Sequence, residues 1–176
     1  MNVLKRSRGG IIMELLSEGL IDDAVARMDT SLGIRGAAEA ISGRPVRKGY
    51  RSEDLACTTY RILIRPYMEA FGRRYVGDSA CLGESGTILC YVAMNRPLDD
   101  ASRKMVAIMT DMSVPSGVST DGFRWACACG ARPRIDRVFD LRPYYIEALD
   151  RRRFRVAVAV DREELRDFEK RMRDVG

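Results

Sequence analysis

The sequence contains no histidine. Imidazole is the side chain that titrates near neutral pH, so histidine-dependent triads, most zinc hydrolases and imidazole general bases are excluded. Any acid–base or metal chemistry must use carboxylates, lysines, tyrosines or thiols. The sequence also lacks a phosphate-binding Gly-x-x-x-x-Gly-Lys loop, a dinucleotide-binding glycine fingerprint and a Gly-x-Ser-x-Gly elbow. ATP-driven and Rossmann-type chemistry are therefore not expected.

Long apolar runs are also missing from the sequence. None approaches the ~20 residues that a membrane-spanning helix needs. The N-terminal run IIMELL is interrupted by Glu14 too early for a signal peptide. The five cysteines are an odd number, which favours reduced thiols over a disulfide framework. We therefore expect a cytoplasmic protein without a membrane partner.

The composition that remains is typical of a folded domain. The 176 residues are enough for one domain with a substantial core. Hydrophobic residues make up 46% and charged residues 31% of the chain, an ordinary globular balance. The formal net charge of +5 is compatible with nucleic acid as a partner, although the 25 acidic residues equally allow an ordinary solvated surface.

The first part of the chain has helical periodicity. Apolar residues recur at helical spacing between positions 9 and 42. We expect Gly19 to divide this stretch into two helices and Gly33 to interrupt the pattern further along the chain. The segment SGRPVRKGY then predicts a loop. These features predict a helical extension over residues 1–48 and a larger domain over residues 49–176.

The larger domain begins with alternating helical and strand signals. A helix is predicted from Ser52, and Pro66 should bend it. Two strands are expected near 74–82 and 87–94, and the second is apolar at nearly every position, which predicts cover on both faces. A helix is expected next over 97–112, with Pro97 in its first turn.

A hairpin and two more helices are predicted in the remainder. Asp121-Gly122 is a strong hairpin signal, and the strand after it places Cys127 and Cys129 on one face. A strand over 135–141, a helix over LRPYYIEALDRRR and a strand over RVAVAV at 155–160 should come next.

Asp161 and Glu164 form a capping-box-like pair ahead of the last helix. The fold class expected from this order of elements is α/β, with a mixed sheet flanked by helices and an N-terminal helical extension.

Five segments between residue 52 and about residue 150 occur in an order that is known from one family: SEDLACTTYRILIRPYMEAFG, RRYVGDSACL, ILCYVAMN, VSTDGFRWACAC and VFDLRPYYIEAL. In this order they resemble the N-terminal nuclease domain of type I restriction-enzyme R subunits, in the PD-(D/E)XK superfamily. Glu53 matches an acid on the family's opening helix, and Asp78 matches its strand acid. Thr120-Asp121-Gly122 matches the family's turn. The resemblance covers somewhat over half of the chain and implies a restriction-endonuclease-like fold.

The resemblance also bears on catalysis. In the superfamily, the strand Asp and a Glu-x-Lys on the neighbouring strand hold magnesium and orient the attacking water. This chain has Ala93-Met94-Asn95 where Glu-x-Lys is expected. The resemblance therefore implies a weakened or inactive nuclease. Any residual activity would use magnesium with Asp78 as its ligand, and otherwise no cofactor is expected. The candidate catalytic residues are Asp78, Glu53, Glu84 and Asn95.

Two further clusters have competing interpretations. Arg103, Lys104 and Arg124 fall next to the former active-site edge, so they are the candidate contacts for nucleic-acid phosphates. The alternative is a solvated surface on which these residues pair with nearby acids. Cys127-x-Cys129 invites a metal interpretation, but a zinc site needs four ligands, so packing of the thiols as small hydrophobic groups is favoured.

Three functions remain open at this point. The first is a nuclease-fold protein, catalytically weakened or inactive, that binds nucleic acid. The second is a structural or regulatory protein that reuses the fold for partner binding or for self-association into a homo-oligomer. The third is a magnesium-dependent nuclease whose ligands have been relocated.

Overall fold

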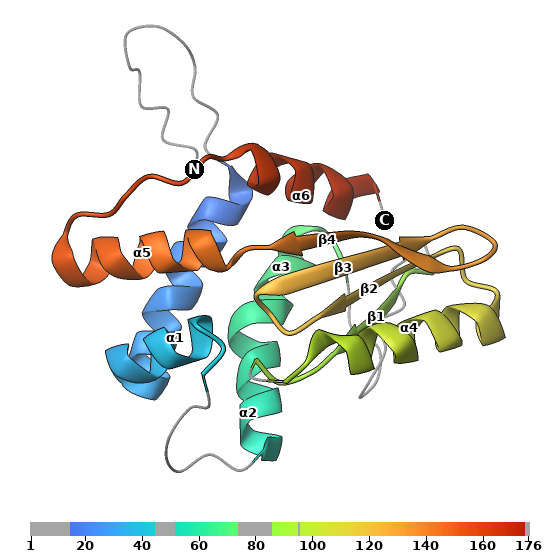
Figure 1. Ribbon diagram of the computed structural model, residues 1–176, viewed down its shortest axis with the longest axis horizontal. Coiled ribbons are helices and arrows are strands. Elements are labelled where there is room, and N and C mark those ends of the chain that lie inside the picture. The colour runs from blue at the N-terminus through green and yellow to red at the C-terminus, as the bar shows by residue number, and fades with distance from the viewer. Residues whose placement is uncertain (1–14, 45–51, 74–85, 95, 175–176) are drawn as a thin grey trace, which may run out of the picture.

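The computed structural model describes residues 15–44, 52–73, 86–94 and 96–174, which form a mixed sheet with helices on both faces (Figure 1). The described strands follow the order β1-β2-β3-β4, in which β1 and β2 are parallel and the other neighbours are antiparallel. Their bounds are β1 Ile88–Tyr91, β2 Ser116–Thr120, β3 Arg124–Cys129 and β4 Arg134–Asp140. This confirms the predicted α/β class with a mixed sheet.

The predicted hairpin is present between β2 and β3. Gly122 has φ 92°, a conformation that glycine adopts without steric cost, and it comes after Asp121 as expected. The β3 segment from Trp125 to Ala128 is buried throughout, so this strand is covered on both faces. The strand predicted at 135–141 is β4, whose outer edge has no strand partner among the described residues.

One helix covers the first face of the sheet. Helix α4 (Leu98–Met112) connects β1 to β2 and packs across both of them. Pro97 lies immediately before this helix, as its position in the sequence predicted. The strand expected at 87–94 is confirmed, but it is shorter because the chain leaves the sheet after Tyr91. Its predicted neighbour at 74–82 lies outside the described residues.

The opposite face of the sheet carries an aromatic core. Helices α1 (Leu16–Ile41), α5 (Arg142–Phe154) and α6 (Glu163–Asp174) contribute to it together with the helical segment around residue 67. The Phe168 ring lies 5.5 Å from Trp125, 5.6 Å from Phe139 and 5.7 Å from Tyr67, centroid to centroid. Residues of the predicted N-terminal extension therefore share one hydrophobic cluster with the sheet.

The first helices are interrupted at two places. Gly19 lies inside α1 without the expected break, whereas Gly33 does interrupt α1, with φ 71° and ψ 163°. The helix from Ser52 consists of α2 (Ser52–Thr59), a π-helical turn η1 (Tyr60–Ile64) and α3 (Arg65–Ala70). The π turn lies directly before Pro66, which has no backbone N–H and clashes with a regular helical turn.

The prediction of a strand at residues 155–160 is wrong. These residues form no strand, and Val156 and Val158 are 74% and 88% exposed. Alternation of Val and Ala is a local signal, whereas a strand also needs a partner edge, and none lies beside this segment among the described residues. The segment links α5 to α6 in Figure 1 as an extended run.

Of the predicted capping pair before α6, Asp161 caps the helix and Glu164 does not. The Asp161 carboxylate accepts a hydrogen bond from the Glu163 N–H at 3.2 Å, as a cap should. Glu164 instead accepts one from the Asp140 N–H at 3.2 Å, so its carboxylate fastens α6 to the end of β4. Within the described ranges, no helix is long and apolar enough to cross a membrane.

Candidate functional site

The structure does not place most of the predicted catalytic residues. Asp78, Glu84 and Asn95 lie outside the described residues, and for Glu53 the backbone is described in α2 but the side chain is not. Of the Ala93-Met94-Asn95 segment, the structure describes the first two residues. The Ala93 side chain is 7% exposed and lies in the hydrophobic cluster on the aromatic side of the sheet. The methyl group that the sequence resemblance aligns with the family's glutamate thus occupies an apolar environment.

Metal ligands do not gather elsewhere in the described ranges, where no group of three or more Cys, Asp or Glu side chains is placed to hold an ion. Cys127 is fully buried, and burial raises its thiol pKa to about 11, which disfavours the thiolate that metals bind. Cys129 is exposed, and its thiol lies 3.3 Å from the Asp136 carboxylate. Packing of Cys127 as a small hydrophobic group agrees with this geometry.

The Thr120-Asp121-Gly122 turn is a dense hydrogen-bonded unit. One Asp121 oxygen accepts hydrogen bonds from the backbone N–H groups of Phe123 and Arg124, at 3.0 and 2.7 Å. The other oxygen accepts two hydrogen bonds from the Arg124 guanidinium, at 2.8 and 2.7 Å. Because Asp121 is buried, this bidentate pair fixes Arg124 at the C-terminal end of β2.

Three arginines meet beside this turn in a pocket of about 290 Å³. Arg96 enters from the loop after β1, Arg124 from the turn after β2, and Arg142 from the first residue of α5 after β4. The strands β1, β2 and β4 run in the same direction, so their carboxyl ends share one edge of the sheet. Such an edge is where ligands commonly bind in α/β proteins. We call this the three-arginine pocket.

Two of the three arginines are held by carboxylates. Arg142 forms a bidentate ion pair with Asp140, and Arg124 forms the pair with Asp121 described above. Burial opposes ionisation of Asp140, but hydrogen bonds from Arg142 and the nearby charge of Arg124 outweigh it and lower the Asp140 pKa. Arg96 is exposed and forms no ion pair with the described residues, so no described carboxylate compensates its positive charge.

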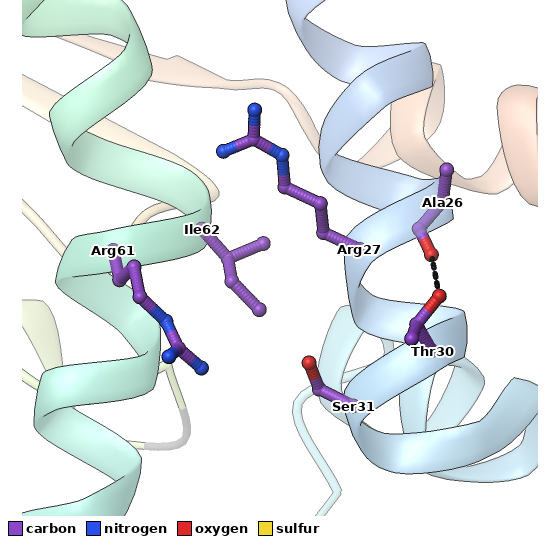
Figure 2. Close-up of a pocket in the computed structure, with 6 residues that line it drawn as sticks. All are labelled: Ala26, Arg27, Thr30, Ser31, Arg61 and Ile62. Carbon is purple, nitrogen blue, oxygen red and sulfur yellow. Dashed lines mark hydrogen bonds between the residues drawn. The ribbon is translucent and has the colours of Figure 1, made fainter.

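A second basic concavity, of about 440 Å³, lies between α1 and the π-helical turn. Figure 2 shows Arg27 from α1 and Arg61 from η1 on opposite walls, with Ile62 between them. No acidic residue of the described structure lines this groove, and neither arginine forms an ion pair there. Like charges facing each other across a groove are stabilised when an anion lies between them. We call this the Arg27–Arg61 groove.

The fold separates the three residues that were predicted to contact phosphates. Arg124 lines the three-arginine pocket, whereas Arg103 and Lys104 lie on the exposed surface of α4, outside its lining. Arg103 is paired with Asp100 one helical turn away. Sequence reasoning missed Arg96 and Arg142, which lie directly after two predicted strands. Their position at strand ends was the available signal.

Comparison with known proteins gives no match, either to a protein-family model, to a curated protein or to a solved structure. Function is therefore inferred from the geometry of the described residues and from the resemblance in the sequence.

Proposed function

We propose that this protein is a nuclease-fold protein that binds the phosphate backbone of nucleic acid and has lost most or all of its catalytic activity. The observation that carries the proposal is the three-arginine pocket. The sequence resemblance puts the former active site at this edge of the sheet, and the pocket presents guanidinium groups there. Guanidinium groups donate N–H hydrogen bonds to phosphate oxygens, and the paired donors of Arg96 are not taken by a described carboxylate.

The ion pairs within the pocket have two effects on binding. They occupy the Nε and one Nη donor of Arg124 and of Arg142, so these arginines can offer a phosphate only their remaining N–H groups. Asp121 and Asp140 fix the side chains of Arg124 and Arg142, so less conformational entropy is lost when a phosphate arrives. Arg96 supplies the charge that no described carboxylate neutralises. The Arg27–Arg61 groove offers a second place for a phosphate on the same chain.

Loss of catalysis is supported by the surroundings of Ala93. Magnesium needs near-octahedral oxygen ligands, usually one or two carboxylates with several waters. Ala93 supplies no oxygen, and its apolar neighbours leave little space for a hydrated ion. With Asp78 alone, a metal ion would be held weakly, and cleavage would be absent or very slow.

Binding is tested by fluorescence anisotropy with labelled duplex DNA, single-stranded DNA and RNA at two salt concentrations. We expect weak, sequence-independent binding in the ~10⁻⁴–10⁻⁶ M range at physiological salt, falling steeply as salt rises. Arg96→Gln should reduce the slope of log K against log salt by about 0.9, which corresponds to one lost phosphate contact. Arg132→Gln is the matched control, because Arg132 is an exposed arginine at the other end of β3. Equal effects of both variants would place the contacts elsewhere, and no binding at low salt would remove the proposal.

Catalysis is tested by incubating plasmid and oligonucleotide substrates with and without magnesium. Little or no cleavage is expected. Robust magnesium-dependent cleavage that Asp78→Ala abolishes would instead support the nuclease with relocated ligands, with Glu84 and Glu53 as the next residues to replace.

A structural or self-associating protein is the second candidate function. The specific observation in its favour is the exposed apolar segment between α5 and α6, with Val156 and Val158 extending into solvent.

A further inference from the structure

The segment at residues 156–160 is apolar, extends into solvent and has few backbone hydrogen bonds. Its sequence is Val-Ala-Val-Ala-Val, without charge, and Val156 and Val158 are 74% and 88% exposed. Of the eight large hydrophobic residues that the described structure exposes most, four lie between positions 146 and 158. Exposed apolar groups concentrated in this way mark an interaction surface more often than a solvated loop.

The backbone of this segment is also largely unpaired. Val160 donates its N–H to Glu147 at 3.1 Å, and its carbonyl accepts a hydrogen bond from Arg162 at 2.6 Å. Between 156 and 159, no backbone group forms a hydrogen bond with any residue of the described chain. Val is a strong strand former, so this is an extended, apolar run with free donors and acceptors, which is the template for strand pairing.

Both ends of the segment are fixed. Helix α5 ends at Phe154, and the next residue, Arg155, adopts a left-handed conformation with φ 57°. At the other end, the Asp161 carbonyl accepts a hydrogen bond from the Tyr144 hydroxyl at 2.8 Å. The run between these anchors is therefore held extended before any partner arrives, which lowers the entropic cost of pairing.

We propose that residues 156–160 pair antiparallel with the same residues of a second copy of this chain, about a two-fold axis at Val158. In this register Val158 lies opposite its own copy and Val156 lies opposite Val160. Val160 already packs against the hydrophobic cluster of its own chain, so Val156 and Val158 of each copy would continue that apolar surface across the pair. A slip by one residue would put two of the valines opposite Ala and the third opposite Arg155 or Asp161, because side chains alternate along a strand.

Charge complementarity at the flanks selects a second copy as the occupant. The same register brings Arg155, next to the segment on one side, opposite Asp161 of the other copy, and the two-fold axis makes this pair twice. Within the described residues Arg155 forms no ion pair with a carboxylate. A two-fold contact also closes on itself, whereas addition of the segment to the β4 edge of another copy would be head-to-tail and would grow into an open chain.

The size of the contact sets the expected affinity. A five-residue strand pair is small beside the roughly 800 Å² per partner of stable complexes. We therefore expect a reversible dimer with a dissociation constant in the micromolar range or weaker. This inference is independent of the proposed nucleic-acid function, because it is tested without nucleic acid.

Sedimentation velocity from low micromolar to submillimolar concentration is the primary measurement. The wild-type chain should shift from monomer to dimer. Val158→Lys should abolish the shift, because it places two like charges directly opposite each other across the axis. Val138→Lys is the matched control, since Val138 is also an exposed valine, 50% accessible on β4, and it should leave the dimer intact. Circular dichroism establishes that both variants are folded.

Hydrogen exchange and charge reversal sharpen the result. The amides of residues 156–159 should become protected as protein concentration rises. Arg155→Glu should weaken the dimer, and a mixture of Arg155→Glu with wild type should associate more weakly than wild type alone. A wild-type chain that stays monomeric throughout the range overturns the inference. So does a dimer that Val158→Lys leaves intact, and loss of the dimer in Val138→Lys would show pairing with β4 instead.

Discussion

The two faces of the sheet are built in different ways. On one face, Phe168 packs its ring against Tyr67, Trp125 and Phe139, and the surrounding helices come from both ends of the chain. On the other face, helix α4 packs small and flexible side chains against the strands. The buried members of that layer are Ile88, Cys90, Leu98, Ala101, Met105, Met109, Ala126 and Ala128.

The difference extends to charged groups. The aromatic face is edged by ion pairs between distant segments, such as Arg162 with Glu147 and Glu18. On α4, the ion pair within the described residues is the exposed Arg103–Asp100 pair inside the helix. The comparison teaches that stability and its pH dependence should reside mainly on the aromatic face. On the α4 face, the free energy of unfolding should depend more on added side-chain volume than on the loss of an ion pair.

Removing the central ring of the aromatic face should have the largest effect. Phe168→Ala is expected to lower the free energy of unfolding by about 3–5 kcal/mol, because it leaves a cavity among four other aromatic rings. Met105→Ala, at a fully buried position on the opposite face, should cost about 2–3 kcal/mol, since flexible methionine neighbours can fill part of the space. Urea denaturation of both variants measures the difference. An equal or larger loss for Met105→Ala would contradict the contrast between the faces.

Neutralising Glu147 should reveal how the stability contributed by the aromatic face depends on pH. Hydrogen bonds from Arg162 lower the pKa of Glu147 below its ordinary value of 4.5. The folded state therefore binds protons less readily than the unfolded state, so the stabilisation is present above pH 4.5 and is lost as pH falls through the folded-state pKa. Glu147→Gln should cost about 2–3 kcal/mol at neutral pH.

The urea midpoints of Glu147→Gln and wild type should converge as the pH is lowered from about 6 towards about 3. A penalty that stays constant over this range would mean that the Glu147 charge does not stabilise the fold. Met105→Ala is the control, because its penalty involves no titrating group and should not change with pH.

Adding a methyl group should disturb the α4 face. A Cβ at Gly117 would lie 2.5 Å from the Met109 sulfur and 2.9 Å from the Met105 Cγ. Gly117→Ala is therefore expected to cost about 1–2 kcal/mol through overpacking, and Met109→Ala in the same chain should recover part of that loss. Gly19→Ala is the matched control, because no atom lies within 4 Å of its Cβ position in α1. Thermal unfolding should show that Gly19→Ala stabilises the protein, by about 0.5–1 kcal/mol.

The surface pair on α4 should contribute least. Asp100→Asn removes the ion pair with Arg103, whose side chain is 78% exposed, so a change within about 0.5 kcal/mol is expected. Comparison of melting temperatures at low and high salt measures it. A loss above about 1 kcal/mol would show that the two faces differ less in their electrostatics than the ion pairs indicate.

Local signals in the sequence predicted those elements whose partners are close along the chain. Asp121-Gly122 predicted the β2–β3 hairpin because the turn itself dictates the pairing of the flanking strands. Pro97 predicted the start of α4 because proline is favoured at the beginning of a helix. At residues 155–160 the alternation of Val and Ala was equally clear, but nothing local can state whether a partner edge exists. That α1 is interrupted at Gly33 and continuous at Gly19 likewise depends on how the two halves of the helix pack.

The candidate site was harder to predict than the fold. Arg124 was identified because it was expected next to the former active-site edge, whereas Arg96 and Arg142 approach it only through the order and direction of the strands. Asp140 and Asp121 neutralise part of the positive charge of the three-arginine pocket. These ion pairs depend on side-chain geometry, which the spacing of residues in the sequence does not encode. The resemblance to the nuclease family drew attention to Ala93, and that expectation about catalysis stays a prediction.

The contact between Glu169 and the start of α1 has a consequence for biosynthesis. Leu15, the residue before α1, provides no side-chain cap, and the Glu169 carboxylate accepts the Ser17 N–H at 2.6 Å. A chain that leaves the ribosome from its N-terminus therefore completes its first helix long before the residue that caps it has been made. Products of interrupted translation that end before α6 would present an uncapped helix and an uncovered aromatic core. Such fragments should be recognised by chaperones and proteases rather than persist as smaller folded proteins.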